Sequence, residues 1–142
     1  MNNLAILWSL LFSFYSAVCD FRYRKITNKS IVLAGAVSLF ILFVKDGFLK
    51  GAAQIAVLIP VWILLFFLFV FKVTGAADIK LLYIISLQTG RDGIILVFIF
   101  SLFAGAFIGI IYLLRGEKTI PFAVAIFIGM VVYFYGKING YL

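Results

Sequence analysis

The chain contains no histidine and a single cysteine, Cys19, among its 142 residues. Without histidine, a Ser-His-Asp triad, a Cys-His pair and a His-ligated zinc site are all impossible within this chain. One cysteine also excludes an intramolecular disulfide and a Cys-x-x-Cys metal cluster. The groups left for acid and base chemistry are five carboxylates together with lysines and tyrosines.

Charged residues are also scarce, at 12% of the chain, whereas 66% of the residues are hydrophobic. Soluble globular proteins average about 25% and about 45–50%, respectively, so this composition predicts a membrane protein. Because a crossing helix needs about 20 residues, about six crossings use most of the chain and leave only short loops. We therefore expect an all-α, polytopic membrane helical bundle that forms one domain over residues 1–142.

Six apolar runs fit this expectation, at about 4–19, 31–44, 51–71, 73–90, 94–114 and 120–135. The first run has no Lys or Arg before it, so we interpret it as a retained helix rather than a signal peptide. Turns are predicted at Lys45-Asp46-Gly47 and at Arg91-Asp92-Gly93. The segment 62–71 is apolar on every face, which predicts partial exposure to lipid.

Basic residues are distributed unequally between the two sides of these six spans. Eight of them fall on one side, namely Arg22, Arg24, Lys25, Lys29, Lys72, Lys80, Arg115 and Lys118. Four fall on the other, namely Lys45, Lys50, Arg91 and Lys137. The positive-inside rule places the larger group in the cytoplasm and both termini outside. We assign the net charge of +7 to this orientation and predict no binding of nucleic acid.

Two aspartates fall on the predicted cytoplasmic face, because Asp20 ends the first run and Asp78 opens the fourth. A carboxylate in a membrane helix costs about 2.5–3.5 kcal/mol on insertion scales, which favours a function for Asp78. Lys80 cannot neutralise Asp78, since residues two apart point to different helix faces. For Asp20, solvation at the helix end or a salt bridge to Arg22 or Arg24 is an equally good explanation from position alone.

The remaining acids and the cysteine have simpler interpretations. Asp46 and Asp92 each lie between a basic residue and glycine, which is typical of solvated turns on the opposite face. Glu117 belongs to a charged turn between the last two runs. Cys19 is interpreted as a small buried apolar residue. The small residues at 75–77, just before Asp78, allow another backbone or a substrate to approach closely.

Three segments together resemble the type IV prepilin peptidases and the archaeal preflagellin peptidases, which are membrane aspartyl proteases of the Gly-x-Gly-Asp group. The first, residues 20–28, resembles an Asp-x-Arg motif followed by a basic stretch and Ile-Pro-Asn. The second, residues 75–81, resembles Gly-x-Gly-Asp-x-Lys-Leu, and the third, residues 118–122, resembles an Ile-Pro-Phe motif before the last helix. Thr27 replaces the family's proline, and Ala77 replaces its second glycine.

The resemblance implies a single peptidase domain in the cytoplasmic (inner) membrane, with Asp20 and Asp78 as the catalytic pair. It implies supporting or substrate-binding roles for Arg22, Gly75, Ala77 and Lys80. The expected activity is removal of a short basic leader from a prepilin-like membrane protein at the cytoplasmic face, in type IV pilus assembly or protein secretion. We predict no metal or organic cofactor, and expect membrane lipids as further partners.

The chain lacks the zinc-binding cysteine pattern and the N-methyltransferase segment of the larger bifunctional enzymes. It is therefore similar to the short, peptidase-only form associated with tight-adherence (Flp) pili. Two other hypotheses remain open at this point. The chain could be a transporter-like bundle that uses Asp20 and Asp78 for protons or cations, or an inactive family member that assists pilus assembly.

Overall fold

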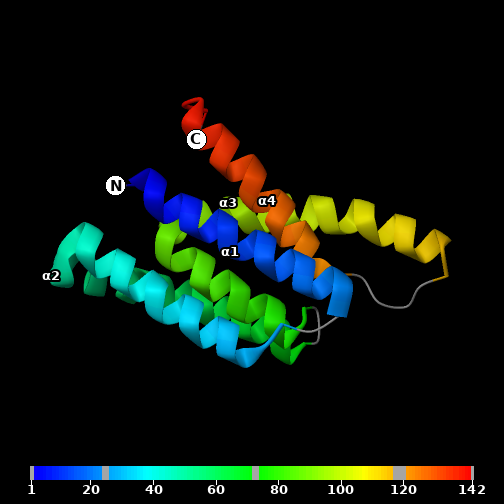
Figure 1. Cartoon of the computed structure of the whole chain (residues 1–142), viewed down its shortest axis with the longest axis horizontal. Coiled ribbons are helices and arrows are strands. Elements are labelled where there is room, and N and C mark those ends of the chain that lie inside the picture. Colours follow the sequence, from blue (N-terminus) through cyan, green and yellow to red (C-terminus); the bar gives the residue numbers. More distant parts are fainter. Residues whose placement is uncertain (1, 24–25, 72–73, 117–120, 142) are drawn as a thin grey trace.

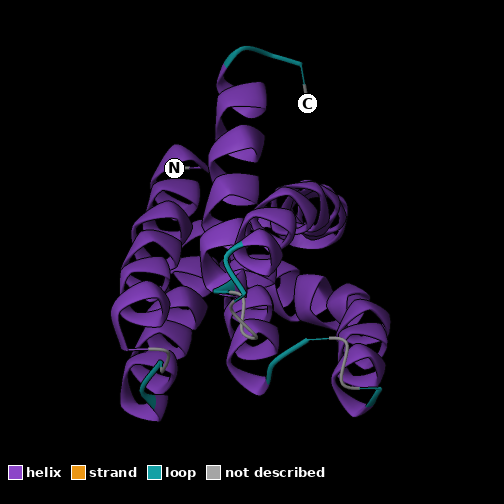
Figure 2. Ribbon diagram, turned by 90° about the vertical axis from the view of Figure 1, so that its right-hand side faces the viewer, coloured by secondary structure: helices purple, strands orange, loops and turns teal. Residues whose placement is uncertain are grey.

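The computed structural model describes residues 2–23, 26–71, 74–116 and 121–141, and they form an all-helical fold. The four helices are α1 (Asn2–Tyr23), α2 (Asn28–Val70), α3 (Ala76–Leu114) and α4 (Phe122–Ile138). By length and composition, α1, α2 and α3 can cross a membrane, whereas α4 has only 17 residues. In Figure 2 the described residues are almost entirely helical. The prediction of an all-α membrane protein is confirmed.

Two glycines bend the two longest helices. Straight helices of 43 and 39 residues, as in α2 and α3, would measure about 65 Å and about 58 Å, or twice the hydrocarbon thickness. Gly47 in α2 has φ 76° and ψ 165°, and Gly90 in α3 has φ 72° and ψ −173°. Glycine adopts a positive φ without steric cost. The chain changes direction at both bends (Figure 1).

The prediction of six spans is not supported as six separate helices: the described residues form four helices, and α2 and α3 each consist of two helical segments joined at a glycine bend. Gly47 lies in the predicted turn 45–47, but Arg91, Asp92 and Gly93 are helical and the second bend is at Gly90. A single positive φ redirects the chain while helical hydrogen bonding continues on either side, so no separate turn is formed. Figure 1 shows both termini at the end of the bundle opposite the one at which α1 ends. That this end faces outside is not supported by the structure.

The first half of α3 forms the centre of the bundle. Most residues from Ile79 to Gln88 are buried, and α3 packs against α1, α2 and α4. Leu42 and Leu58 from α2 and Ile126 from α4 belong to the same core cluster. The first half of α3, which contains the shortest uncharged run of the predicted spans, is therefore surrounded by the other helices, and they shield it from lipid.

Apolar side chains cover the outside of the second half of α2. Ile63, Leu64, Phe66 and Phe67 are each more than 50% exposed, while Leu65 is buried. In water, so continuous an apolar surface would be unfavourable. The structure confirms that residues 62–71 are largely exposed on the outside of the bundle, while their contact with lipid remains a prediction.

Polar side chains inside the bundle make hydrogen bonds between helices. The Trp8 indole N–H donates to Ser38 Oγ at 3.0 Å, and Gln88 Nε2 donates to the Ser38 carbonyl at 2.7 Å. The Trp62 indole N–H donates to Ser86 Oγ at 2.8 Å. Since unpaired polar groups are costly in hydrocarbon, these bonds fix how α1, α2 and α3 lie against one another.

Candidate active site

Asp20 lies near the end of α1 and is held by the first turn of α4. Its Oδ2 atom accepts a hydrogen bond from the Ala123 backbone N–H at 3.3 Å. The first N–H groups of a helix have no partner within the helix and carry partial positive charge, so a carboxylate is stabilised there. Pro121, directly before α4, is buried and its fixed φ of −74° suits the start of a helix. The position of Asp20 is thus set by two helices.

Asp78 is the third residue of α3. It therefore lies in the first turn of this helix, as the sequence predicted. Its carboxylate accepts a hydrogen bond from the backbone N–H of Gly75, the N-cap residue. This is the reciprocal half of a capping box, which satisfies a helix N–H that would otherwise lack a partner. A Cβ atom on residue 75 would lie 2.9 Å from Asp78 Oδ2. A larger side chain at residue 75 would therefore require the Asp78 carboxylate to shift.

The structure brings these two aspartates together. Asp20 lies close enough to Asp78 for the two carboxylates to repel each other, and both are half-buried. They come from helices separated by more than fifty residues and meet at the end of the bundle opposite the termini (Figure 1). The structure thus places Asp20 and Asp78 within range of an electrostatic interaction, while their catalytic role remains a prediction.

Lys80 connects the start of α3 to the start of α2. Its ammonium group donates to Asn28 Oδ1 at 3.1 Å, and both side chains are exposed. Thr27, where the family has proline, caps α2 by accepting a 3.4 Å hydrogen bond from the Ser30 backbone N–H. Sequence reasoning missed Asn28 as a partner of Lys80. The available signal was its place at the end of the Ile-x-Asn motif.

The other two predicted supporting residues differ in their surroundings. Ala77 is half-buried, and its methyl group packs against the hydrophobic core. An alanine in place of the family's second glycine therefore fits this helix without a clash at the core. Arg22 is exposed and lines an apolar groove beside Asp20.

The described parts of the first two segments and the start of α4, which follows the third segment, thus gather at one end of the bundle. Asn28 contacts Lys80 in the second segment, and Ala123, next to the third segment, contacts Asp20 in the first. The residues 24–25 and 117–120 lie outside the described residues, including Arg24, Glu117 and Lys118, on which predictions were made. The convergence itself could not be read from local patterns.

The remaining described acids lie beside the helix bends. Asp46 forms an ion pair with Lys45 at 3.3 Å, and Asp92 is exposed. Within the described ranges, no three side chains of His, Cys, Asp or Glu gather to hold a metal ion. Asp20 and Asp78 are therefore the acids that the fold sets apart as a pair.

The fold and the paired acids define a membrane-embedded helical protein with a carboxylate pair near one end. Comparison with protein families matches residues 6–110 to the type IV leader peptidase family, and this range includes both Asp20 and Asp78. Since the match covers well over half of the chain, the protein belongs to the type IV leader peptidase family, a family of proteases. Comparisons with curated proteins and with solved structures give no match.

Proposed function

We propose that this protein is an aspartic-type endopeptidase that removes the short basic leader of a prepilin-like membrane protein. The observation that carries the proposal is the meeting of Asp20 and Asp78 within the part of the chain that matches the family. Both residues are held by backbone N–H groups at helix starts, so neither depends on a flexible loop for its position. Such fixed geometry favours a role in chemistry over accidental proximity.

The chemistry needs only one proton shared between the two carboxylates. Two carboxylates about 4 Å apart at an effective dielectric of about 20 repel by about 4 kcal/mol, which opposes ionisation of both. The ionised member takes a proton from a water molecule, whose oxygen attacks the scissile carbonyl carbon. The protonated member donates a hydrogen bond to the carbonyl oxygen and stabilises the negative charge that develops there. The C–N bond then breaks as the leaving amine takes the proton that the carboxylate removed from water, which returns the pair to one shared proton. The proton belongs to the pair rather than to one residue.

The basic residues near the pair support the proposed side of the membrane. Arg22, Lys29 and Lys80 all lie near the helix ends that surround Asp20 and Asp78. The positive-inside rule therefore favours cleavage at the cytoplasmic face of the inner membrane, by a multi-pass protein. A substrate with a basic leader ahead of an apolar helix would present its scissile bond at the cytoplasmic face of the membrane.

Co-expression with a candidate prepilin-like substrate tests the proposal, with leader removal read as a change in gel mobility. Asp20→Asn and Asp78→Asn should each abolish processing, whereas Asp92→Asn, an exposed acid beside a helix bend, should process normally. Normal processing by either of the first two variants would refute the assignment. Ion flux that depends on the same two acids, without any processing, would favour the transporter. Absence of both activities would favour an assembly partner.

A further inference from the structure

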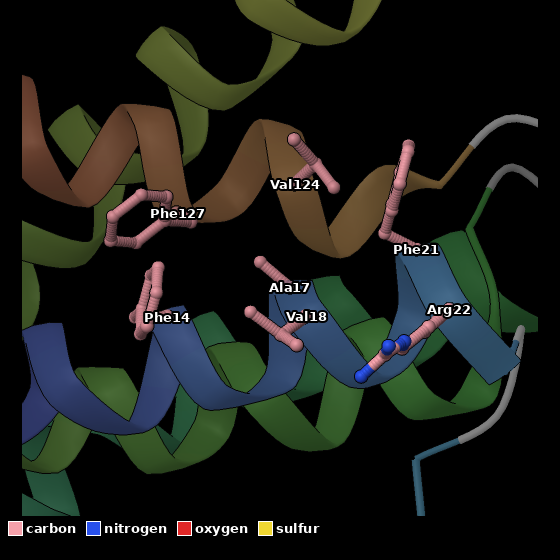
Figure 3. A pocket seen from close by; sticks show the side chains of 7 residues that line it. All are labelled: Phe14, Ala17, Val18, Phe21, Arg22, Val124 and Phe127. Carbon is pink, nitrogen blue, oxygen red and sulfur yellow. The ribbon is translucent and has the colours of Figure 1, made fainter.

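An apolar groove of about 420 Å³ lies between α1 and α4. Phe14 and Val18 line one wall and Val124 and Phe127 the other, as Figure 3 shows. The rings of Phe14 and Phe127, with centroids 5.3 Å apart, meet at one end of the groove. Phe14 and Val18 are 53% and 43% exposed, so the groove is open to whatever surrounds the protein.

The other end of the groove is next to the candidate active site. Phe21 and Arg22 line this end and directly follow Asp20 in α1. On the opposite wall, Val124 directly follows Ala123, the residue that donates a hydrogen bond to Asp20. The contact that positions the Asp20 carboxylate therefore also joins the two walls of the groove. The Phe21 end of the groove therefore adjoins the backbone that holds the Asp20 carboxylate.

We propose that this groove binds the apolar helix of the substrate, immediately after the scissile bond. The inference rests on the proposed function and adds the position that the substrate helix takes on the protein. From Phe14 to Phe21 the groove covers about 10 Å of helix, enough for about two turns of a bound helix. The groove thus recognises the first six or seven residues after cleavage, and the rest of the substrate helix lies in lipid.

The lining of the groove matches an apolar helix. Asp20 lies near the Phe21 end through its hydrogen bond to Ala123, and six of the seven lining residues are apolar. Arg22 is the one charged lining residue, and in Figure 3 its side chain lies near the Phe21 end. The chain must be extended at the cleaved bond, where carbonyls lack helical partners. The planar donors of Arg22 can bind such carbonyls.

The Val18→Trp variant fills the groove and tests the proposal, with Leu7→Trp as the matched control. Leu7 lies on the same helix and is also 43% exposed, but it does not line the groove. Two substrates are compared, a full-length prepilin-like protein and a short peptide that spans the cleavage site and lacks the apolar helix. Val18→Trp should lower kcat/KM for the full-length substrate at least about tenfold more than for the peptide. Leu7→Trp should leave this ratio as in the wild type.

A photo-crosslinking residue at position 18 gives a second readout that does not depend on turnover. In the Asp20→Asn background, crosslinks to the first two turns of the substrate helix are expected, and position 7 should give none. Equal effects of the two tryptophan variants, or crosslinks from position 18 to lipid alone, would overturn the groove assignment. Loss of the proposed function would appear differently, as a wild-type protein that cleaves neither substrate.

Discussion

Replacing Gly75 with alanine separates the geometry of the aspartate pair from the stability of the fold. The backbone at Gly75 has φ −73° and ψ 152°, which alanine adopts without strain. The added Cβ would lie 2.9 Å from Asp78 Oδ2, whereas ordinary van der Waals contact begins at 3.4 Å. The carboxylate oxygen must therefore shift, and a movement of about 0.5 Å, the difference between these distances, restores ordinary contact.

This displacement should affect catalysis far more than folding. Misplacement of a reacting group by about 1 Å can cost about 100-fold in rate, so we expect Gly75→Ala to slow leader removal by about 10- to 100-fold. The unfolding free energy should change by less than about 1 kcal/mol, because only the end of a flexible side chain moves and alanine restricts the unfolded chain. Initial rates and thermal unfolding of the purified protein in detergent measure the two effects.

Gly35→Ala is the matched control, since a Cβ on residue 35 would have nothing within 4 Å. This variant should keep the wild-type rate and fold at least as stably, because alanine favours a helix interior over glycine. A Gly75→Ala protein with wild-type activity would show that the Asp78 carboxylate does not need the position described here. A loss of activity that is fully explained by a loss of folded protein would show that Gly75 acts only through folding.

Two further predictions concern contacts around the candidate site. Gly129→Ala should destabilise the protein by about 1–3 kcal/mol, because its Cβ would lie 2.6 Å from the Val97 carbonyl oxygen in α3; wild-type thermal stability would contradict this packing of α3 against α4. Lys80→Met and Asn28→Ala should each cost less than about 1 kcal/mol, because their hydrogen bond is exposed. In a double-mutant cycle, the double variant should lose less unfolding free energy than the two single variants together. Strict additivity of the two losses would mean that the contact is absent.

The helical, lipid-facing character of this chain was predictable because it depends on summed composition. Runs of apolar residues such as 62–71 report burial in lipid whatever their partners are. The bends at Gly47 and Gly90 were harder to place, since glycine is compatible with a turn, a helix and a bend alike. The choice among these depends on the backbone dihedral angles, which the surrounding helices determine.

The candidate site, like the fold, was only partly predictable from the sequence. Asp20 and Asp78 could be singled out because a carboxylate near hydrocarbon is costly at any position. The groups that hold them could not, since Ala123 is 103 residues from Asp20 and Asn28 is 52 residues from Lys80. Ala123 acts through its backbone N–H, which every non-proline residue has, so its side chain gave no signal.

The most direct test of a working aspartate pair is a double-mutant cycle of initial rates, measured with purified protein and a prepilin-like substrate. Initial rates of leader removal are compared for the wild type, Asp20→Asn, Asp78→Asn and the double variant. If the two carboxylates act as one unit, each single variant loses at least about 100-fold and the double variant is no slower than the slower single one. A single variant that keeps more than about a tenth of the wild-type rate, or losses that multiply in the double variant, would contradict the account.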